Sequence, residues 1–500
     1  MKRENFIAVT INDTGFAYDV HSLVKAFYPA CDVKVYAQED EKDSSSNGLP
    51  DMDIRFTRQS VLFSLIVKSN ERVSLDVEKI EITEDMPRAD IKNRLKQLLY
   101  EVLSKHTGKK LPWGTLTGIR PTKIPMTMLE EGKSDADIME YMKKTYFISD
   151  EKGELAIQIA KREKALLDTL HYEDGYSLYI GIPFCPTTCL YCSFTSYPIV
   201  SWKKRTGEYL DALEKEIEFV AESHKDRILD TIYIGGGTPT TLEAPELQRL
   251  LNKLKDTLDL SHLKEFTVEA GRADSITPEK LRVLKECGVT RISVNPQTMK
   301  QETLDMIGRR HTVEQVKEAF AMAREAGFTN INMDLILGLP GEKEEDVRHT
   351  MEEIKKLGPD SLTVHSLAIK RASKLSQWIE ENGISALNNT EETMRITADG
   401  AAELEMVPYY LYRQKNMSGN FENVGYAKEG KFGIYNILIM EEKQTIVALG
   451  AGSITKRVFA DGRIERCDNV KDVSLYIEKI DEMIERKRKL FAAIHAVNLQ

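Results

Sequence analysis

The sequence predicts an α/β protein in which six βα units form a partial, TIM-like barrel between an α+β module and a mixed C-terminal domain. Strand-like and helical runs alternate between residues 171 and 371, a pattern typical of a parallel sheet with right-handed crossovers. Six units are too few to close an eight-stranded barrel of the usual kind, so we expect an open one. The length of 500 residues favours two or three domains, because one hydrophobic core rarely grows so large.

Residues 1–170 are expected to form the α+β module, which ends in a helical linker. Four runs show the β-branched alternation of strands: FIAVTI, VKVYAQ, SVLFSLIVKS and RVSLDVEKIEI. The polar stretch 38–51 predicts a loop. Apolar residues at helical spacing over 91–103 predict a helix. The stretch PWGTLTGIRPTK, at 112–123, predicts an ordered loop whose simplest role is packing.

Residues 171–371 are expected to form the barrel. Its strands are predicted from six short runs: SLYIGI, TIYIGG, EFTVEA, RISVNP, INMDLIL and SLTVHS. Helical runs such as GEYLDALEKEIEFVAE and TVEQVKEAFAMAREAG lie between them. Binding sites in such folds lie at the carboxyl ends of the strands, so the side chains that follow these strands are candidates for the site.

Residues 372–500 are expected to form the mixed domain. The runs FGIYNILIME and QTIVALGAGS predict a hairpin, and the tail VSLYIEKIDEMIERKRKLFAAIHAV predicts a helix. The basic run 486–489 lies on this helical pattern. It is predicted to be a solvated face.

The composition is that of an ordinary globular protein, with 41% hydrophobic and 30% charged residues. The net charge of −10 argues against a nucleic-acid partner, which usually requires a basic face. No apolar run is long enough for a signal peptide or a membrane span. The expected location is therefore the reducing cytoplasm, where clustered cysteines usually indicate metal or redox chemistry. Cys31, Cys287 and Cys467 are isolated in sequence, and each is expected to be a small buried apolar residue.

The stretch GIPFCPTTCLYCSF holds three of the six cysteines, Cys185, Cys189 and Cys192. A structural zinc site needs a fourth ligand, and the closest histidine in sequence, His171, is a weak candidate. A CxxC redox pair leaves Cys185 without a role, and three packed free thiols with no function are an improbable accident. The spacing C-x3-C-x2-C favours an iron–sulfur cluster, in which three thiolates hold three irons and the fourth iron stays open to a ligand.

Glycines and polar residues follow the next strands. YIGGGTPT comes after the second strand, where Gly236 and Gly237 allow the backbone to approach a ligand closely. Polar residues at the later strand ends are expected to line the same mouth, where acidic ones suit ribose hydroxyls; they are Glu269, Gln297, Arg309 and Asp334.

The cysteine spacing and its context resemble the radical S-adenosylmethionine (SAM) superfamily. The strings LYIGIPFCPTTCLYCSF, GGGTPT, GRRHT, DLILGLP and LGAGS, within about 176–454, resemble its oxygen-independent coproporphyrinogen III oxidase branch, the HemN and HemW types. The N-terminal module with PWGTLTGIRPTK, and the strings VHSLAIKRASKL and YRQKNMSGNFENVGY, resemble the coproporphyrinogen dehydrogenase type, HemZ, over nearly the whole chain.

The resemblance implies the cofactors and their residues. Cys185, Cys189 and Cys192 would hold a [4Fe–4S] cluster whose open iron binds SAM, and an electron from the cluster would cleave SAM to a 5′-deoxyadenosyl radical. Two groups of residues would hold SAM. For the first SAM they are Tyr179, which is also the catalytic candidate, Tyr191, Gly236, Gly237, Thr238, Glu269 and Ile454. For a second SAM they are Gln297, Arg309, Asp334 and Ala368.

The resemblance also implies an activity, the oxidative decarboxylation of two propionates of coproporphyrinogen III to vinyl groups. The product would be protoporphyrinogen IX, and a flavodoxin or ferredoxin would supply electrons. Basic residues suit the propionates, and the candidates are Arg310, Lys370, Arg371 and Arg413.

Three departures from the HemN pattern keep rival functions open. Gly181 stands where HemN-type proteins have histidine, Phe194 stands where they have a further cysteine, and Glu342 replaces the commoner glutamine. Phe194 is the HemW-like choice, and HemW-type proteins are associated with haem trafficking. The rivals are therefore a haem-binding or haem-delivery protein, and a radical SAM enzyme that acts on another tetrapyrrole. A non-catalytic thiol or zinc protein is the third rival.

Overall fold

The computed structural model describes residues 5–29, 31–38, 44–46, 48–69, 72–118, 120–193, 196–369, 373–383, 387–414 and 421–492. The chain divides into two compact units. The first is Met1–Ala160 with Tyr412–Glu422, and the second is Lys161–Leu411 with Asn423–Gln500. The three-domain division at residues 170 and 371 stays a prediction.

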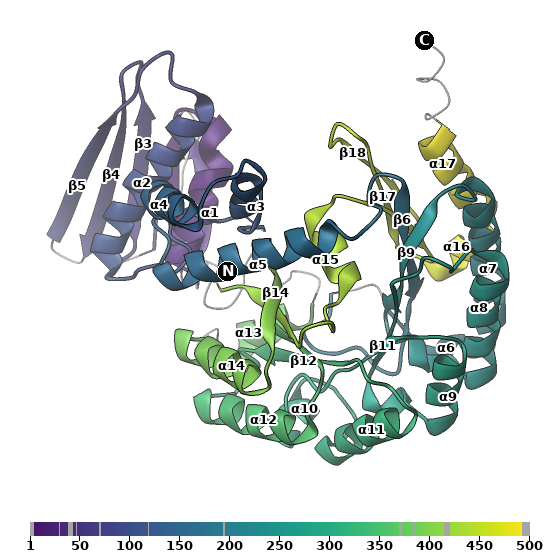
Figure 1. The fold of residues 1–500 in the computed structure, drawn as a ribbon. Helices are drawn as coiled ribbons and strands as arrows, with labels where there is room; N and C mark the ends of the chain where they lie inside the picture. The colour runs from purple at the N-terminus through teal and green to yellow at the C-terminus, as the bar shows by residue number, and fades with distance from the viewer. Residues whose placement is uncertain are drawn as a thin grey trace, which may run out of the picture. The chain divides into compact units, whose positions relative to one another are not determined.

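The first unit contains a five-stranded sheet in the order β2-β1-β3-β4-β5 (Figure 1). β1 runs parallel to β2 and β3, and the other pairs are antiparallel. The strands are β1 (Phe6–Ile11), β2 (Asp32–Ala37), β3 (Pro50–Phe56), β4 (Ser60–Ser69) and β5 (Arg72–Glu81). The four predicted strands are confirmed, but β3 was missed. Its sequence PDMDIRF carries three charged residues, which strands usually avoid, while its Met52 and Ile54 are buried in the core.

The helices of the first unit follow the apolar pattern of the sequence. The predicted helix is α2, which buries Leu95, Leu98, Leu99, Val102 and Leu103 and ends at Gly108 in the left-handed region. With α1 it completes the core over the sheet. The helices are α1 (Ala17–Phe27), α2 (Arg88–Thr107), α3 (Lys123–Glu130), α4 (Asp135–Tyr146) and α5 (Asp150–Leu167), preceded by the 3₁₀ turn η1 (Thr14–Phe16).

The loop at 112–123 is built around Trp113, which is completely buried. Its Nε1 donates a hydrogen bond of 2.7 Å to Oε2 of Glu422, and Lys152 Nζ lies 2.8 Å from Oε1 of the same carboxylate. Burial opposes the charge of Lys152, but Glu422 raises its pKa above the usual value. Arg413 donates to the Leu116 carbonyl at 2.6 Å. The described contacts of this loop are those of packing, as the sequence predicts.

The second unit contains a curved eleven-stranded sheet in the order β14-β15-β13-β12-β11-β10-β9-β6-β16-β17-β18. Six of its strands, β6, β9, β10, β11, β12 and β13, run parallel in chain order. β16 extends them in parallel beside β6. The described sheet does not close on itself, so the predicted partial barrel is confirmed.

The six parallel strands include all the predicted barrel strands, two of them with the predicted bounds. The barrel strands are β6 (Gly175–Ile182), β9 (Ile228–Gly236), β10 (Glu265–Gly271), β11 (Arg291–Val294), β12 (Ile331–Leu337) and β13 (Ser361–Ser366). The remaining strands are β7 (Phe184–Cys185), β8 (Tyr197–Pro198), β14 (Val407–Tyr412), β15 (Asn423–Ala427), β16 (Thr445–Leu449), β17 (Ile454–Val458) and β18 (Ile464–Asp468).

Helices cover the outer, convex side of this sheet (Figure 1). The helices of this unit are α6 (Ile199–Trp202), α7 (Thr206–Ser223), α8 (Ala244–Thr257), α9 (Pro278–Glu286), α10 (Gln301–Met306), α11 (Val313–Glu325), α12 (Glu344–Leu357), α13 (Leu375–Asn382), α14 (Glu391–Glu403), α15 (Ile434–Glu441), α16 (Val473–Glu478) and α17 (Ile480–Ala492). Helices α7, α8, α9, α11 and α12 separate the barrel strands along the chain, whereas α15 lies on the inner side of the sheet (Figure 1). Two 3₁₀ turns, η2 (Pro239–Thr241) and η3 (Ala273–Ser275), follow β9 and β10.

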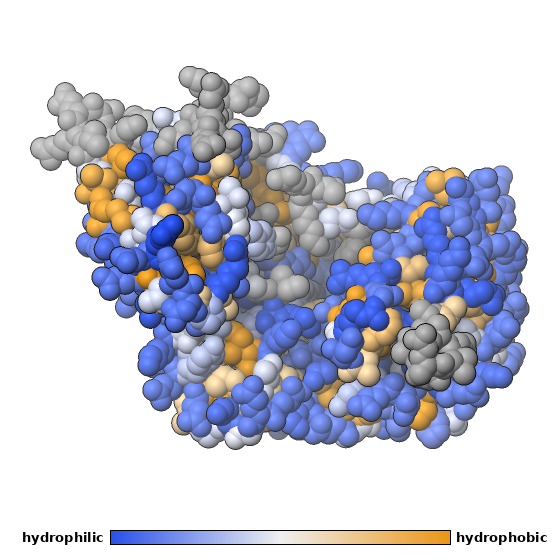
Figure 2. Space-filling model, turned by 90° about the horizontal axis from the view of Figure 1, so that it is seen from above, coloured by the Kyte–Doolittle hydropathy of each residue, from blue (hydrophilic) through white to orange (hydrophobic). Residues whose placement is uncertain are grey.

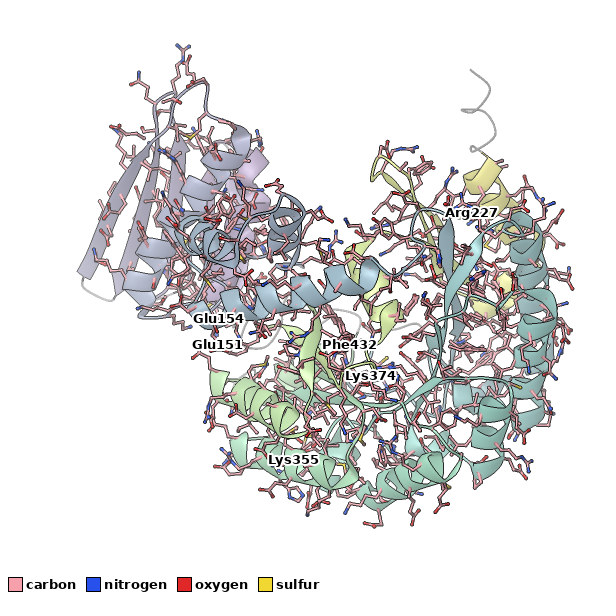
Figure 3. All side chains as sticks on the ribbon, viewed as in Figure 1. Glu151, Glu154, Arg227, Lys355, Lys374 and Phe432 are labelled. Carbon is pink, nitrogen blue, oxygen red and sulfur yellow. The ribbon has the colours of Figure 1, made fainter. Side chains whose placement is uncertain are left out.

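Capping and surface pairs fix these helices. The side chains of Thr277, Thr312 and Thr390 cap the starts of α9, α11 and α14. On the outer surface, Lys355 of α12, labelled in Figure 3, lies 2.6 Å from Glu403 of α14.

Hydrophilic residues cover most of the face shown in Figure 2. No helix of the described chain combines the length and apolar character that a membrane span requires.

The predicted strand FGIYNILIME is wrong, because residues 434–441 form helix α15. A short apolar run rich in isoleucine does not distinguish a strand from a buried helix by its periodicity. The helix buries Tyr435, Ile437 and Leu438. Its first amide, that of Ile434, donates to Glu265 of β10 at 2.5 Å, which satisfies a group that a helix start leaves open. The predicted hairpin is formed instead by β16 and β17.

The basic run 486–489 is only partly a solvated face. Lys487 is 0% exposed, and its Nζ lies 2.7 Å from Glu216, which is also 0% exposed. Glu216 accepts further hydrogen bonds from the Gly450 amide at 2.8 Å and the Tyr476 hydroxyl at 2.5 Å. The carboxylate therefore joins α7, α17 and the LGAGS turn, contacts between distant parts of the sequence that periodicity does not predict.

Substitution of Lys487 by methionine is expected to destabilise the second unit by about 3–5 kcal/mol, because it leaves the Glu216 carboxylate buried without its cation. Urea denaturation followed by circular dichroism measures this loss. The matched variant Lys489→Met, at an exposed position of the same helix, is expected to change stability by less than about 0.5 kcal/mol. Equal stability of the two variants would show that the buried pair contributes nothing.

Candidate functional site

The three clustered cysteines lie at the carboxyl end of the first barrel strand. Cys185 ends β7, just after β6, and the Cys192 amide donates to the Cys189 carbonyl at 3.1 Å in the loop that follows. The Leu190 amide in this loop bonds to the Ile307 carbonyl at 2.9 Å, which ties the loop to the end of α10. All three cysteines are free thiols, so the sequence-predicted set is brought to the edge where sites in such folds lie.

The surroundings of the sulfur atoms fit an iron–sulfur cluster. Thr238 Oγ1 donates to Cys185 Sγ at 3.6 Å, and Arg272 donates to Cys189 Sγ at 3.9 Å. Hydrogen bonds of this kind to cysteine sulfur are a normal feature of protein-bound clusters. Burial raises the pKa of the Cys185 thiol, a cost that metal binding to the thiolate offsets. Among the described residues, no three His, Cys, Asp or Glu side chains lie close enough together to bind a single metal ion. An iron–sulfur cluster does not require such a group, because each thiolate binds a different iron.

The glycine loop after β9 lies directly against the cysteine loop. The Gly237 amide donates to the Ile182 carbonyl at 2.8 Å, and the Thr238 amide donates to the Phe184 carbonyl at 2.7 Å. A side chain at Gly237 would meet the Phe184 carbonyl oxygen at 2.5 Å, and Gly236 has a φ of +104°. Both positions therefore require glycine, one for space and the other for its backbone conformation.

Three tyrosine rings stack beside this loop. Tyr179 of β6 and Tyr233 of β9 have ring centroids 6.2 Å apart, and Tyr435 of α15 lies 4.4 Å from Tyr233. The Tyr233 hydroxyl donates to Glu269 of β10. Burial raises the pKa of Tyr179, which keeps its hydroxyl protonated. Tyr233 and Tyr435 were not singled out from the sequence, although Tyr233 stands immediately before the glycines.

Glu269 is poised to change its charge near neutral pH. Burial is the main cause that raises its pKa from 4.5 to about 7, with Asp334 adding to the effect and the Tyr233 hydrogen bond opposing it. Between pH 4.5 and about pH 7, Glu269 is protonated in the folded protein but ionised in the unfolded chain. Stability therefore falls as the pH rises from about 4.5 to about 7, and the full cost is present above that range.

The variant Glu269→Gln has no carboxyl group at this position, so it is expected to lack the free-energy cost of ionising Glu269 in the folded protein. Without SAM, its stability relative to the parent protein should increase from pH 5 to pH 8, by about 3 kcal/mol in total. Thermal or urea denaturation across this pH range measures the difference. The control Glu279→Gln changes an exposed residue and should show a constant difference. A constant difference for Glu269→Gln would contradict the raised pKa.

Gln297 and Asp334 are brought together where β11 ends. The Gln297 backbone has a φ of +71°, unusual for a residue with a side chain. In this conformation its amide donates to the Asp334 carbonyl at 2.9 Å and its own carbonyl accepts from the Ile336 amide at 2.9 Å. Asp334 lies 3.7 Å from His365; although burial opposes it, this histidine lowers the pKa of Asp334. Among the described residues, the buried Oε1 of Gln297 has no hydrogen-bond partner.

Arg309 lies beside the cysteine loop, next to Tyr191, which belongs to that loop. Arg309 is buried and donates from NH1 to the Asn295 carbonyl at 2.5 Å, and its Nε has no partner in the described chain. Burial disfavours its charge, but Tyr191 and then Cys189 raise its pKa. The pKa of Tyr191 is raised, mainly by burial. A buried cation with an open N–H suits an anionic ligand.

The other predicted site residues differ in their exposure and in their described contacts. Ala368 is half-buried after β13, and Ile454, at the start of β17, is 46% exposed. Arg310 is exposed. The described contacts of Arg413 lie in the first unit, where burial lowers its pKa to about 10. Lys370, Arg371 and Phe194 lie outside the described residues.

Comparisons with known proteins identify the family. Residues 179–354 match the radical SAM superfamily. The chain is 39% identical over 489 residues, 97% of each chain, to the "oxygen-independent coproporphyrinogen-III oxidase-like protein HemZ" of Bacillus subtilis. This chain belongs to the HemZ family of radical SAM proteins.

Two further matches are more distant. The chain is 34% identical to the "heme chaperone HemW" of Bacillus subtilis over 61% of its own length and 76% of that protein. Among solved structures, HemN of Escherichia coli, described as a coproporphyrinogen III oxidase and radical SAM enzyme, matches with a TM-score of 0.50 and 23% identity. It covers 64% of this chain and 72% of HemN, and shows the fold alone. Family membership implies a [4Fe–4S] cluster and SAM as cofactors, and it supports a role connected with tetrapyrroles.

Proposed function

We propose that this protein decarboxylates two propionates of coproporphyrinogen III to vinyl groups, without oxygen, and so forms protoporphyrinogen IX. The observation that carries the proposal is the loop of three free cysteines at the mouth of a barrel lined by buried polar side chains. The relative named as an oxygen-independent coproporphyrinogen-III oxidase-like protein matches along 97% of the chain, so the substrate assignment is supported beyond the barrel alone.

The residues of the site would divide the work between two loops. The thiolates of Cys185, Cys189 and Cys192 would anchor the cluster, with one iron left for SAM. Gly236, Gly237 and Thr238 would lie against the amino group of SAM, and Tyr179, Tyr191 and Glu269 would contact SAM from the same mouth. Ile454 would approach the adenine. Gln297, Arg309, Asp334 and Ala368 remain candidates for a second SAM.

Bound together, the cluster and SAM would supply the removal of a hydrogen atom from an unactivated C–H bond, here the β-carbon of a propionate. Loss of CO₂, with transfer of one electron to an external one-electron acceptor, would then leave the vinyl group. The protein holds the reacting carbon close and excludes water and competing hydrogens. Tyr179 and Glu269, which are half-buried, would contribute to that exclusion. Cluster reduction would need a low-potential donor, for which we propose a flavodoxin or ferredoxin.

A second function has independent support. One relative that is 34% identical is named a heme chaperone. The chain also has Gly181 and Phe194 at positions that set HemN-type proteins apart. A haem-binding protein that keeps the cluster and SAM without decarboxylation is therefore the alternative.

Anaerobic incubation with dithionite, SAM and coproporphyrinogen III distinguishes the two. We expect 5′-deoxyadenosine and a tetrapyrrole that has lost two CO₂, both detected by chromatography with mass spectrometry. The variant Cys189→Ala should form neither product, whereas Cys287→Ala, at a buried cysteine outside the cluster loop, should retain both. Stoichiometric haem binding with no vinyl product would overturn the decarboxylase proposal in favour of haem binding.

A further inference from the structure

We propose that Arg272 is a positioning residue for the cluster, and that its N–H group on Cys189 raises the reduction potential of the cluster. The inference deepens the proposed function and rests on it for the presence of the cluster. Nothing in the cysteine motif or the glycine loop indicates this residue.

The backbone after β10 presents Arg272 to the cysteine loop. The pairing of β10 with β11 shifts register between Glu269 and Gly271, and Gly271 has a φ of +63°. A bulge of this kind bends the strand and redirects the side chains beside it. Glu269 thus meets Tyr233 of the neighbouring strand, while Arg272, three residues later, reaches the thiol loop.

The guanidinium is held on three sides. Its NH1 donates to Cys189 Sγ at 3.9 Å, and to Thr187 Oγ1 and the Thr187 carbonyl at 2.7 and 3.1 Å. Its Nε and NH2 donate to the two carboxylate oxygens of Asp274 at 3.0 and 2.6 Å. Such a bidentate pair fixes the plane of the guanidinium. Thr187 lies between Cys185 and Cys189, so the same group braces the loop that carries both thiols.

The Arg272 side chain is 4% exposed and that of Asp274 is 20% exposed, so water screens the charge only weakly on the sulfur side. A donor and a positive charge beside a cluster sulfur stabilise the reduced cluster, which carries one more negative charge. A second buried cation, Arg309, lies near the same cysteine, and its NH1 is engaged by the Asn295 carbonyl. His311, also buried, has its Nδ1 3.9 Å from Asp274, beyond hydrogen-bond distance.

The physical consequence concerns the electron donor. Because Arg272 raises the reduction potential of the cluster, an electron donor of less negative potential is able to reduce it. The residue therefore acts before any tetrapyrrole is bound, and its effect is measurable on the cluster alone.

The test is a redox titration of the anaerobically reconstituted full-length protein, followed by electron paramagnetic resonance of the reduced cluster. In Arg272→Met, we expect the ratio of reduced to oxidised cluster at the parent midpoint to fall about tenfold, which is about 59 mV for a one-electron couple. Arg272→Lys keeps the charge and should recover part of the shift. The control Arg249→Met removes an exposed arginine paired with Asp211 and Glu214 and should leave the midpoint unchanged.

A midpoint equal to that of the parent in Arg272→Met, with full iron content, would overturn the inference and leave a structural brace only. If that variant assembles no cluster, Asp274→Asn decides. Its guanidinium charge is no longer compensated, so the midpoint should become more positive, and an unchanged midpoint overturns the inference. The titration needs no tetrapyrrole. If the midpoint potential shifts as expected in Arg272→Met but the parent protein forms no vinyl product, the proposed decarboxylation is refuted and the role of Arg272 stands.

Discussion

Substitution of Cys189 by serine is expected to weaken binding of the cluster by more than about 100-fold, so that the anaerobically reconstituted protein loses most of its iron. Even the loss of an outer-shell partner typically weakens metal binding by 10–100-fold, and this variant removes one of only three protein anchors. The sulfur-to-iron charge-transfer absorbance should disappear with the iron. Iron analysis and visible absorption spectra of the same sample measure both effects.

The matched control is Cys287→Ser, which changes a cysteine in the barrel that is equally buried but lies at the end of α9. It should keep its cluster, although it loses some stability because a hydroxyl replaces a buried thiol. Equal iron content in the two variants would mean that Cys189 is not a ligand and that the cluster assignment fails at this residue.

Substitution of Gly237 by alanine is expected to have the second largest effect. The new methyl group would lie 2.5 Å from the Phe184 carbonyl oxygen and 2.8 Å from the Ile182 carbonyl oxygen. Both carbonyls accept hydrogen bonds from the glycine loop itself, from Thr238 and Gly237, so the backbone has little freedom to move away. We expect a loss of about 3 kcal/mol of stability, the upper end of the usual cost of overpacking, and SAM binding weakened about tenfold or more.

Gly207→Ala provides the comparison for this variant. Nothing lies within 4 Å of a methyl group at Gly207, and alanine is the better helix former in α7. Its thermal stability and its SAM affinity, measured by calorimetry under anaerobic conditions, should be unchanged or slightly higher. If Gly237→Ala behaved in the same way, the close contact between the two loops would be wrong.

The barrel could be predicted well because each of its strands has a recognisable local sequence pattern. INMDLIL and SLTVHS are short runs in which apolar residues recur at every second position, as in strands, and β12 and β13 have the predicted bounds. The pattern fails where tertiary contacts outweigh local preference. β3 is a strand despite the charged residues in PDMDIRF, and α15 is a helix whose first amide is satisfied by Glu265, 169 positions away in sequence.

The site shows the same limit. The cysteines, the glycine loop and the polar residues at strand ends are recognisable because each is a local signal at a known place in the fold. Arg272 contacts Cys189 across 83 positions, and Lys487 contacts Glu216 across 271. An arginine in EAGRADS or a lysine in a basic run carries no mark of such a partner. The turn-forming Gly271 was the only available hint that the chain beyond Glu269 turns back toward the site.

The most direct test of the proposed site is the cleavage of SAM by the dithionite-reduced protein in the absence of any tetrapyrrole. We expect 5′-deoxyadenosine and methionine in equal amounts, and neither product when SAM is supplied to Cys189→Ser. A parent protein with a complete, reduced cluster that leaves SAM intact would contradict the central claim that this cysteine loop and glycine loop together form a SAM-cleaving site.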